Sequence, residues 1–416
     1  MPSFIHRVSR QILAGIVGTI LTSSALAFCQ SSESVAQVKP MERQLNMLVL
    51  GDSVLWGEGL KTEHKSWYQV KTWLAATTGR AVIERIEAHS GAVIEARDAT
   101  ESKTAADGEV NVTLPTVSDQ IDRALRHYTD GSKVDLVLVN GCANDIGSQS
   151  LLNAAITTDE IRRLTEAKCG LPIERLLRKI MSSFASAHVI LTGYYPFFSE
   201  QTRNDFLMKA MARRFFKDNP GAPKMSSKVT LERLTANSRV WYEASNKSMA
   251  EVVAKVNADF GSRGSRPRIV FAEIHFLPEH SFGAPETRLW GFNRSPLKRL
   301  LVLLSFGKVK PETNDERRKQ RNSGCDEFYR RRASDMPDQK KDRENRRLTC
   351  RYAALGHPNR KGALLYAEEI TSQLKSAISE AWWLRELGAT PIKPESNDFS
   401  ANSFLGFAHS VLGEIK

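Results

Sequence analysis

Short apolar runs alternate along the chain with longer segments that are apolar on one face only. Runs rich in β-branched residues predict strands, and segments with an apolar period near 3.6 predict helices. The predicted strands are 45–50, 81–86, 134–139, 188–192 and 268–274, and the predicted helices are 67–77, 116–128, 172–184, 230–260 and 359–383. This order predicts an α/β fold, in which helices cover both faces of a parallel sheet of about five strands.

Two large insertions are expected to interrupt this pattern. The first, about 200–262, has a helical pattern, and the second, about 276–350, combines an aromatic, proline-containing loop with a basic segment. We therefore predict one domain over 45–388 that contains both insertions, followed by a C-terminal tail over 389–416.

The N-terminus has the features of an export signal. Two arginines precede an apolar run over 12–28, which contains the small-residue pattern Ala25-Leu26-Ala27. We predict a signal peptide over 1–27, cleaved after Ala27, and a polar tether over 28–44. Export to a periplasmic or extracellular space follows. Two alternatives stay open: an uncleaved anchor, and lipidation of Cys29 in an imperfect lipoprotein box.

Export makes disulfide bonds plausible, because thiols oxidise outside the cytosol. Neighbourhood in the sequence favours the pairs Cys142–Cys169 and Cys325–Cys350, although four cysteines allow three connectivities. The cysteine and histidine spacing shows no zinc-site pattern, so no metal site is expected.

Half of the net charge of +12 lies in one segment. Residues 308–351 hold fifteen Lys or Arg against nine Asp or Glu and show no clear apolar period. We interpret this segment as a solvated surface loop, stapled by a disulfide bond. Its charge also suits contact with an anionic surface, such as phospholipid head groups or acidic polysaccharide. Nucleic acid is not expected as a partner, because no recognition motif is present.

Polar clusters follow several of the predicted strands. Gly51-Asp52-Ser53 follows the first strand, Ser90-Gly91 the second, and Ala143-Asn144-Asp145 the third, while Gly356-His357-Pro358-Asn359 precedes the last helix. In parallel sheets, ligands bind beyond the carboxyl ends of the strands. We interpret Asp52 and Asp145 as turn or cap residues.

The four clusters, in this order, resemble the blocks of the SGNH, or GDSL-type, hydrolases. That family consists of esterases and acylhydrolases with a three-layer, flavodoxin-like fold. The resemblance covers about 45–195 and 350–380. It implies that Ser53 is the nucleophile, that His357 is the general base, and that Ser53, Gly91 and Asn144 form the oxyanion hole. It implies no cofactor.

Two positions depart from the family pattern. Ala354 stands where the family usually has an aspartate that orients the histidine. A backbone carbonyl or an acid from elsewhere, such as Asp326 or Asp335, would then take over that task. Cys142 stands at a glycine position, and a bond to Cys169 would pin the loop that carries Asn144.

The leading hypothesis is an exported serine esterase that acts on lipid or acyl esters, or on O-acetylated carbohydrate. The aromatic loop over 276–292 would favour a lipase if it covered an acyl chain. The alternative is a non-catalytic carbohydrate- or lipid-binding protein with the same fold, because Ala354 removes the usual orienting acid.

Overall fold

The computed structural model describes residues 44–95, 115–205, 224–260, 268–291, 314–332 and 340–379. These residues belong to one compact unit that begins at Arg43. The predicted signal peptide, nearly all of the predicted tether and the predicted tail lie outside the described residues.

A five-stranded parallel sheet forms the centre of this unit. Its strands are β1 (Leu45–Leu50), β2 (Val82–Ile86), β3 (Leu136–Val139), β4 (His188–Thr192) and β5 (Ile269–Ala272). They lie in the order β2-β1-β3-β4-β5, and every neighbouring pair is parallel. This is the flavodoxin-like order. The predicted α/β fold class and all five predicted strands are confirmed.

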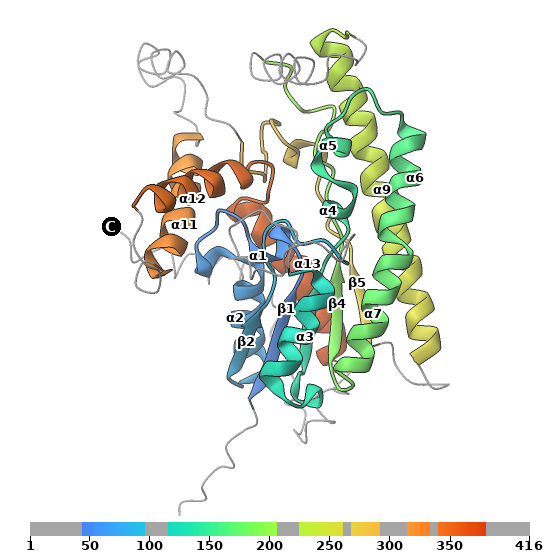
Figure 1. Cartoon of the computed structure of the whole chain (residues 1–416), viewed down its shortest axis with the longest axis vertical. Helices are drawn as coiled ribbons and strands as arrows, with labels where there is room; N and C mark the ends of the chain where they lie inside the picture. The colour runs from blue at the N-terminus through green and yellow to red at the C-terminus, as the bar shows by residue number, and fades with distance from the viewer. Residues whose placement is uncertain are drawn as a thin grey trace, which may run out of the picture. The chain divides into compact units, whose positions relative to one another are not determined.

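Alternate residues of the strands point into two separate hydrophobic cores, as the period of two in a strand requires. In β1, Met47 and Val49 face a core completed by α2 (Ser66–Thr78) and α13 (Arg360–Ser379). Leu48 and Leu50 face a larger core. The helices of that second core are α3 (Val117–Tyr128), α6 (Thr158–Cys169), α7 (Leu171–Ser183) and α9 (Ser227–Phe260). The unit therefore has three layers, helix, sheet and helix (Figure 1).

Helix α9 differs from the sequence-based expectation. It lies within the predicted first insertion, yet it connects β4 to β5 and packs against α6 and α7 (Figure 1). Its buried side chains, among them Leu234, Trp241 and Val256, belong to the main core. Residues 227–260 are therefore the crossover helix that a parallel strand pair requires.

The basic segment also differs from expectation, because its described part is helical. Helix α11 (Asn314–Arg332) packs against α12 (Lys340–Ala353), and Cys325 is bonded to Cys350 between them (Figure 1). The expected surface loop is thus a disulfide-linked helical hairpin. Both cysteines are fully buried, and they form a small apolar cluster of their own.

Short elements connect the larger ones. They are α1 (Ser53–Trp56), η1 (Thr62–His64), η2 (Gly131–Lys133), α4 (Ala143–Ile146), α5 (Ser148–Leu151) and η3 (Pro278–His280). A search of the described helices finds none with the length and apolar content needed to cross a bilayer.

Candidate active site

Ser53 lies in a tight turn at the carboxyl end of β1, which lies between β2 and β3 in the sheet. It is the first residue of α1, and Asp52 caps that helix by accepting the Val54 amide hydrogen at 2.9 Å. Gly51 has a φ of +133°, and a Cβ there would lie 1.9 Å from the Asn140 side chain. The turn therefore needs glycine at this position, and it leaves Ser53 6% exposed.

His357 meets Ser53 from the other end of the chain. Its Nε2 lies 2.6 Å from Ser53 Oγ, across a separation of 304 residues. Trp290 fixes the loop before α13, since its amide donates to the His357 carbonyl and its carbonyl accepts from the Gly356 amide, each at 2.8 Å. Gly356 has a φ of +82° and lies against Phe197, where a Cβ would come within 2.2 Å of the ring.

No carboxylate orients His357 within the described residues. Its Nδ1 is buried and makes no hydrogen bond there, although the carbonyl oxygens of residues 353–355 lie close enough to raise the pKa of the imidazole. Ala354 is fully buried in an apolar cluster with Leu60, Trp290 and Ala363. The position of the usual aspartate is thus filled by apolar packing.

Of the two acids suggested as substitutes, Asp326 makes its hydrogen bonds elsewhere. Asp326 Oδ1 accepts hydrogen bonds from Arg347 at 2.8 Å and from Arg351 at 3.0 Å, inside the hairpin. Asp335 lies outside the described residues. The neighbouring carbonyl oxygens are therefore the groups that favour a proton on Nδ1, which leaves Nε2 as an acceptor facing Ser53.

Asp52 influences His357 through its charge. Burial lowers the pKa of His357 below its ordinary value, and the Asp52 carboxylate is the strongest influence that raises it. Asp52 is 1% exposed, and its oxygens accept hydrogen bonds from Tyr194, Asn140 and Val54. Sequence reasoning assigned Asp52 a turn or cap role, which the structure shows, but did not find this electrostatic role.

Gly91 and Asn144 lie on the loops that follow β2 and β3. Gly91 has a φ of +85°, and Asn144 Nδ2 donates to the Ala92 carbonyl at 3.0 Å, which ties the two loops together. Asp145 strengthens this link because its carboxylate accepts the Ile94 amide hydrogen at 3.1 Å. Among the described residues, the amides of Ser53 and Gly91 donate no hydrogen bond.

A disulfide bond fixes the start of the Asn144 loop. Cys142 is bonded to Cys169 at the end of α6, and both are fully buried. Cys142 has a φ of +94°, in the left-handed region where glycine is favoured. Residue 142 therefore has the backbone conformation that favours glycine, although it is a disulfide-bonded cysteine.

The aromatic residues near the site are core residues. Tyr195 stacks on Phe276 with ring centroids 4.9 Å apart, and Phe197 stacks on Phe282 at the same distance. Phe276, Phe282 and Trp290 are buried. The described part of the aromatic loop is therefore packed against the domain.

Comparison with solved structures finds several enzymes to which the chain is similar. One is an extracellular lipase from Streptomyces rimosus, 16% identical, covering 59% of this chain and 87% of that one, with a TM-score of 0.37. Phospholipase A1 from Streptomyces albidoflavus is 14% identical, with 61% and 89% covered and a TM-score of 0.37. A Clostridium thermocellum family 3 carbohydrate esterase is 13% identical, with 59% and 86% covered and a TM-score of 0.31.

No family model and no curated protein matches the chain. The fold class rests on the sheet order and the three layers described above. The four sequence blocks that resemble the SGNH hydrolases all lie near the carboxyl ends of β1, β2 and β3 or in the loop that reaches Ser53.

Proposed function

We propose that the protein is a serine hydrolase of carboxylic esters, with Ser53 as nucleophile and His357 as general base. The 2.6 Å contact between Ser53 Oγ and His357 Nε2 carries this proposal. A serine hydroxyl is a weak nucleophile at neutral pH, and a base within hydrogen-bonding distance makes attack feasible. Because burial lowers the pKa of His357, the imidazole is neutral at pH 7 and able to accept the proton.

The reaction proceeds through an acyl-enzyme. Ser53 Oγ attacks the ester carbonyl while its proton passes to His357 Nε2. The alcohol then leaves with that proton, and an ester bond to Ser53 remains. Water attacks this ester and gives one proton to His357. The acid leaves as the bond to Ser53 Oγ breaks, and His357 returns that proton to Ser53 Oγ.

The charge on the carbonyl oxygen needs hydrogen-bond donors at each tetrahedral stage. The amides of Ser53 and Gly91 and the second amide hydrogen of Asn144 are the donors that the loops present. One such donor is typically worth about 3–4 kcal/mol of the activation barrier.

Export is part of the proposal. The Cys142–Cys169 and Cys325–Cys350 bonds suit an oxidising compartment, and the first 27 residues have the pattern of a signal peptide. The solved structures to which the chain is similar include lipases and carbohydrate esterases, so acyl and acetyl esters are the substrates to test.

The test uses residues 28–416, purified under oxidising conditions, with p-nitrophenyl acetate, butyrate and a long-chain ester. We expect Ser53→Ala and His357→Ala each to lower kcat at least a thousandfold. Ser182→Ala and His275→Ala serve as matched controls, because both residues lie on the surface away from the Ser53–His357 contact. Full activity of Ser53→Ala would exclude the proposed nucleophile.

A non-catalytic binding protein is the second candidate, because His357 Nδ1 has no carboxylate partner in the described residues. In a triad enzyme, loss of the orienting acid lowers kcat about ten-thousandfold. A fluorophosphonate probe separates the two candidates. Covalent labelling of Ser53 in the folded wild-type protein supports the hydrolase, whereas an unlabelled serine supports the binding protein.

A further inference from the structure

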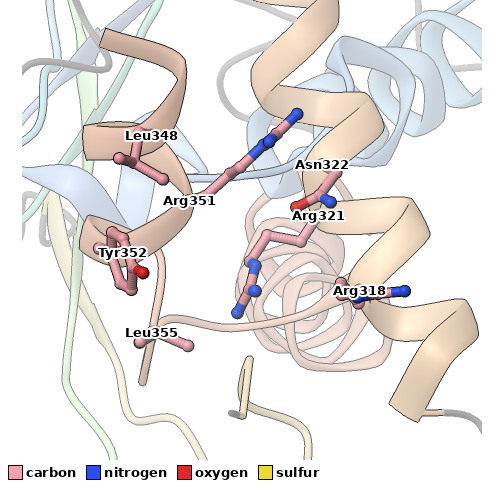
Figure 2. Close-up of a pocket in the computed structure, with 7 residues that line it drawn as sticks. All are labelled: Arg318, Arg321, Asn322, Leu348, Arg351, Tyr352 and Leu355. Atoms are coloured by element: carbon pink, nitrogen blue, oxygen red, sulfur yellow. The ribbon is translucent and has the colours of Figure 1, made fainter. Parts of the chain in front are cut away.

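The helical hairpin forms one side of an open pocket that the proposed reaction does not use. Its volume is about 250 Å³, and it lies between α11 and α12 (Figure 2). Three arginines line it, together with Leu348, Tyr352 and Leu355; the arginines are Arg318, Arg321 and Arg351. A pocket of this size is close to the lower end of the range for small-molecule sites.

Arg321 is the buried cation of this pocket. It is 6% exposed, and one terminal nitrogen of its guanidinium donates to the Gly291 carbonyl at 3.1 Å. Its Nε is buried and has no hydrogen-bond partner among the described residues. A buried donor without an acceptor is costly, and a bound acceptor would remove that cost.

Positive charge exceeds negative charge around Arg321. Burial lowers the pKa of Arg321, and the nearby charges of Arg351 and Arg318 lower it further. Asp326 shares one oxygen between Arg351 and Arg347, and no carboxylate lines the pocket itself. Arg321 is thus the buried guanidinium that an anion in this pocket would meet.

We propose that this pocket binds the oxyanion group, a carboxylate or a phosphate, of an acidic ester substrate. The planar guanidinium pairs with either group through two parallel hydrogen bonds. In Figure 2 the Arg321 side chain extends toward Leu355, with Tyr352 on the opposite wall. An aromatic and an aliphatic wall suit the sugar ring or the glycerol carbons that carry such a group.

The pocket is coupled to the candidate active site through the chain. Leu355 lies two residues before His357, so their Cα atoms are at most about 7 Å apart. The carbonyl that accepts from Arg321 belongs to Gly291, next to Trp290, which holds the His357 loop. One wall of the pocket therefore continues into the loop that carries the base. This role in substrate choice rests on the proposed esterase function, whereas the binding itself does not.

The first test is calorimetric titration of residues 28–416 with inorganic phosphate and, separately, with glucuronate. We expect at least one probe to bind, and Arg321→Gln to weaken its binding at least tenfold. Arg162→Gln is the matched control, because Arg162 is exposed on α6 and its loss changes the net charge equally. Arg318→Gln decides the question if Arg321→Gln fails to fold.

The two probes distinguish the source of the oxyanion. Tighter binding of phosphate assigns a phosphate ester, and tighter binding of glucuronate assigns an acidic sugar. The proposal is overturned if neither probe binds, or if folded Arg318→Gln and Arg321→Gln proteins bind as the wild type does.

A kinetic test extends this to substrate choice. We expect Arg321→Gln to lower kcat/KM for an O-acetylated glucuronate at least tenfold more than it lowers kcat/KM for p-nitrophenyl acetate. Equal effects on both esters would overturn the role in substrate choice. Ser53→Ala leaves the pocket intact. Anion binding by this variant therefore tests the binding site separately from ester hydrolysis.

Discussion

The Tyr194 hydroxyl donates a 2.6 Å hydrogen bond to Oδ2 of Asp52, the residue before the proposed nucleophile. The other carboxylate oxygen accepts from Asn140 at 2.8 Å and from the Val54 amide at 2.9 Å. Asp52 is therefore buried with both oxygens satisfied, which is how a carboxylate remains charged inside a protein. That charge is the largest influence opposing the effect of burial on His357.

Replacement of Asp52 by Asn tests this electrostatic link. Because the Asp52 charge raises the pKa of His357, its removal lowers that pKa further. The ascending limb of the kcat/KM profile with pH then moves to lower pH in Asp52→Asn. Tyr194→Phe keeps the charge, so its limb should move much less. A limb that moves to higher pH in Asp52→Asn would contradict the assigned influence.

The backbone at Cys142 predicts different effects for two ways of removing its disulfide bond. Cys142→Ala with Cys169→Ala loses a cross-link that spans 27 residues, which costs about 3–4 kcal/mol of unfolding free energy. Cys142→Gly with Cys169→Ala loses the same bond but relieves the left-handed conformation at φ +94°. The glycine variant should be more stable than the alanine variant by about 1–2 kcal/mol, measured by urea unfolding. Equal midpoints would show that residue 142 is not strained.

Replacement of Gly356 by alanine should destabilise the protein more than the same replacement at Gly79, which has a similar backbone conformation. Gly356 and Gly79 have φ values of +82° and +70°, but a Cβ at Gly79 has no neighbour within 4 Å, whereas one at Gly356 meets Phe197 at 2.2 Å. Gly79→Ala should therefore lower the free energy of unfolding only by the cost of holding alanine at a positive φ, about 1–2 kcal/mol. Gly356→Ala adds overpacking of about 1–3 kcal/mol and displaces His357, so it also lowers kcat. Comparable stability and kcat for the two variants would argue against this contact.

Buried histidine makes the fold sensitive to acid. Burial, and to a smaller extent the Arg268 charge, lowers the pKa of His188 to about 3. Between pH 3 and 6.5 the unfolded chain binds a proton at this position and the folded chain does not, so stability falls as the pH falls. The slope from this residue is up to about 1.4 kcal/mol per pH unit. His188→Gln should flatten the dependence of unfolding free energy on pH by that amount, and an unchanged slope in this variant would contradict the effect assigned to His188.

Local patterns were sufficient to predict the sheet and most of the helices around it. β1 and β4 are found at the predicted residues because a buried parallel strand is a short, nearly continuous apolar run. Helix α9 was predicted as a helix but not as part of the core. Its buried face includes the polar residues Asn237, Ser245 and Asn246, which weaken the apolar pattern.

The hairpin was not predicted because its stability does not come from an apolar face. Helix α11 is strongly polar, and a disulfide bond and a buried arginine take the place of a hydrophobic stripe. For the candidate site, only the residues that match the SGNH hydrolase blocks could be predicted from the sequence. The influence of Asp52 on His357 acts across some 300 positions of sequence and depends on which loops the fold brings together.

The separation of Ser53 and His357 by 304 positions has a consequence for biogenesis. If the protein is exported as proposed, the serine enters the translocation channel first, and the histidine follows only with α13. An incompletely translocated molecule therefore contains the nucleophile without its base. Under the proposed function, the protein cannot attack the lipids or glycans of the envelope that it crosses until its last core helix has docked on the sheet.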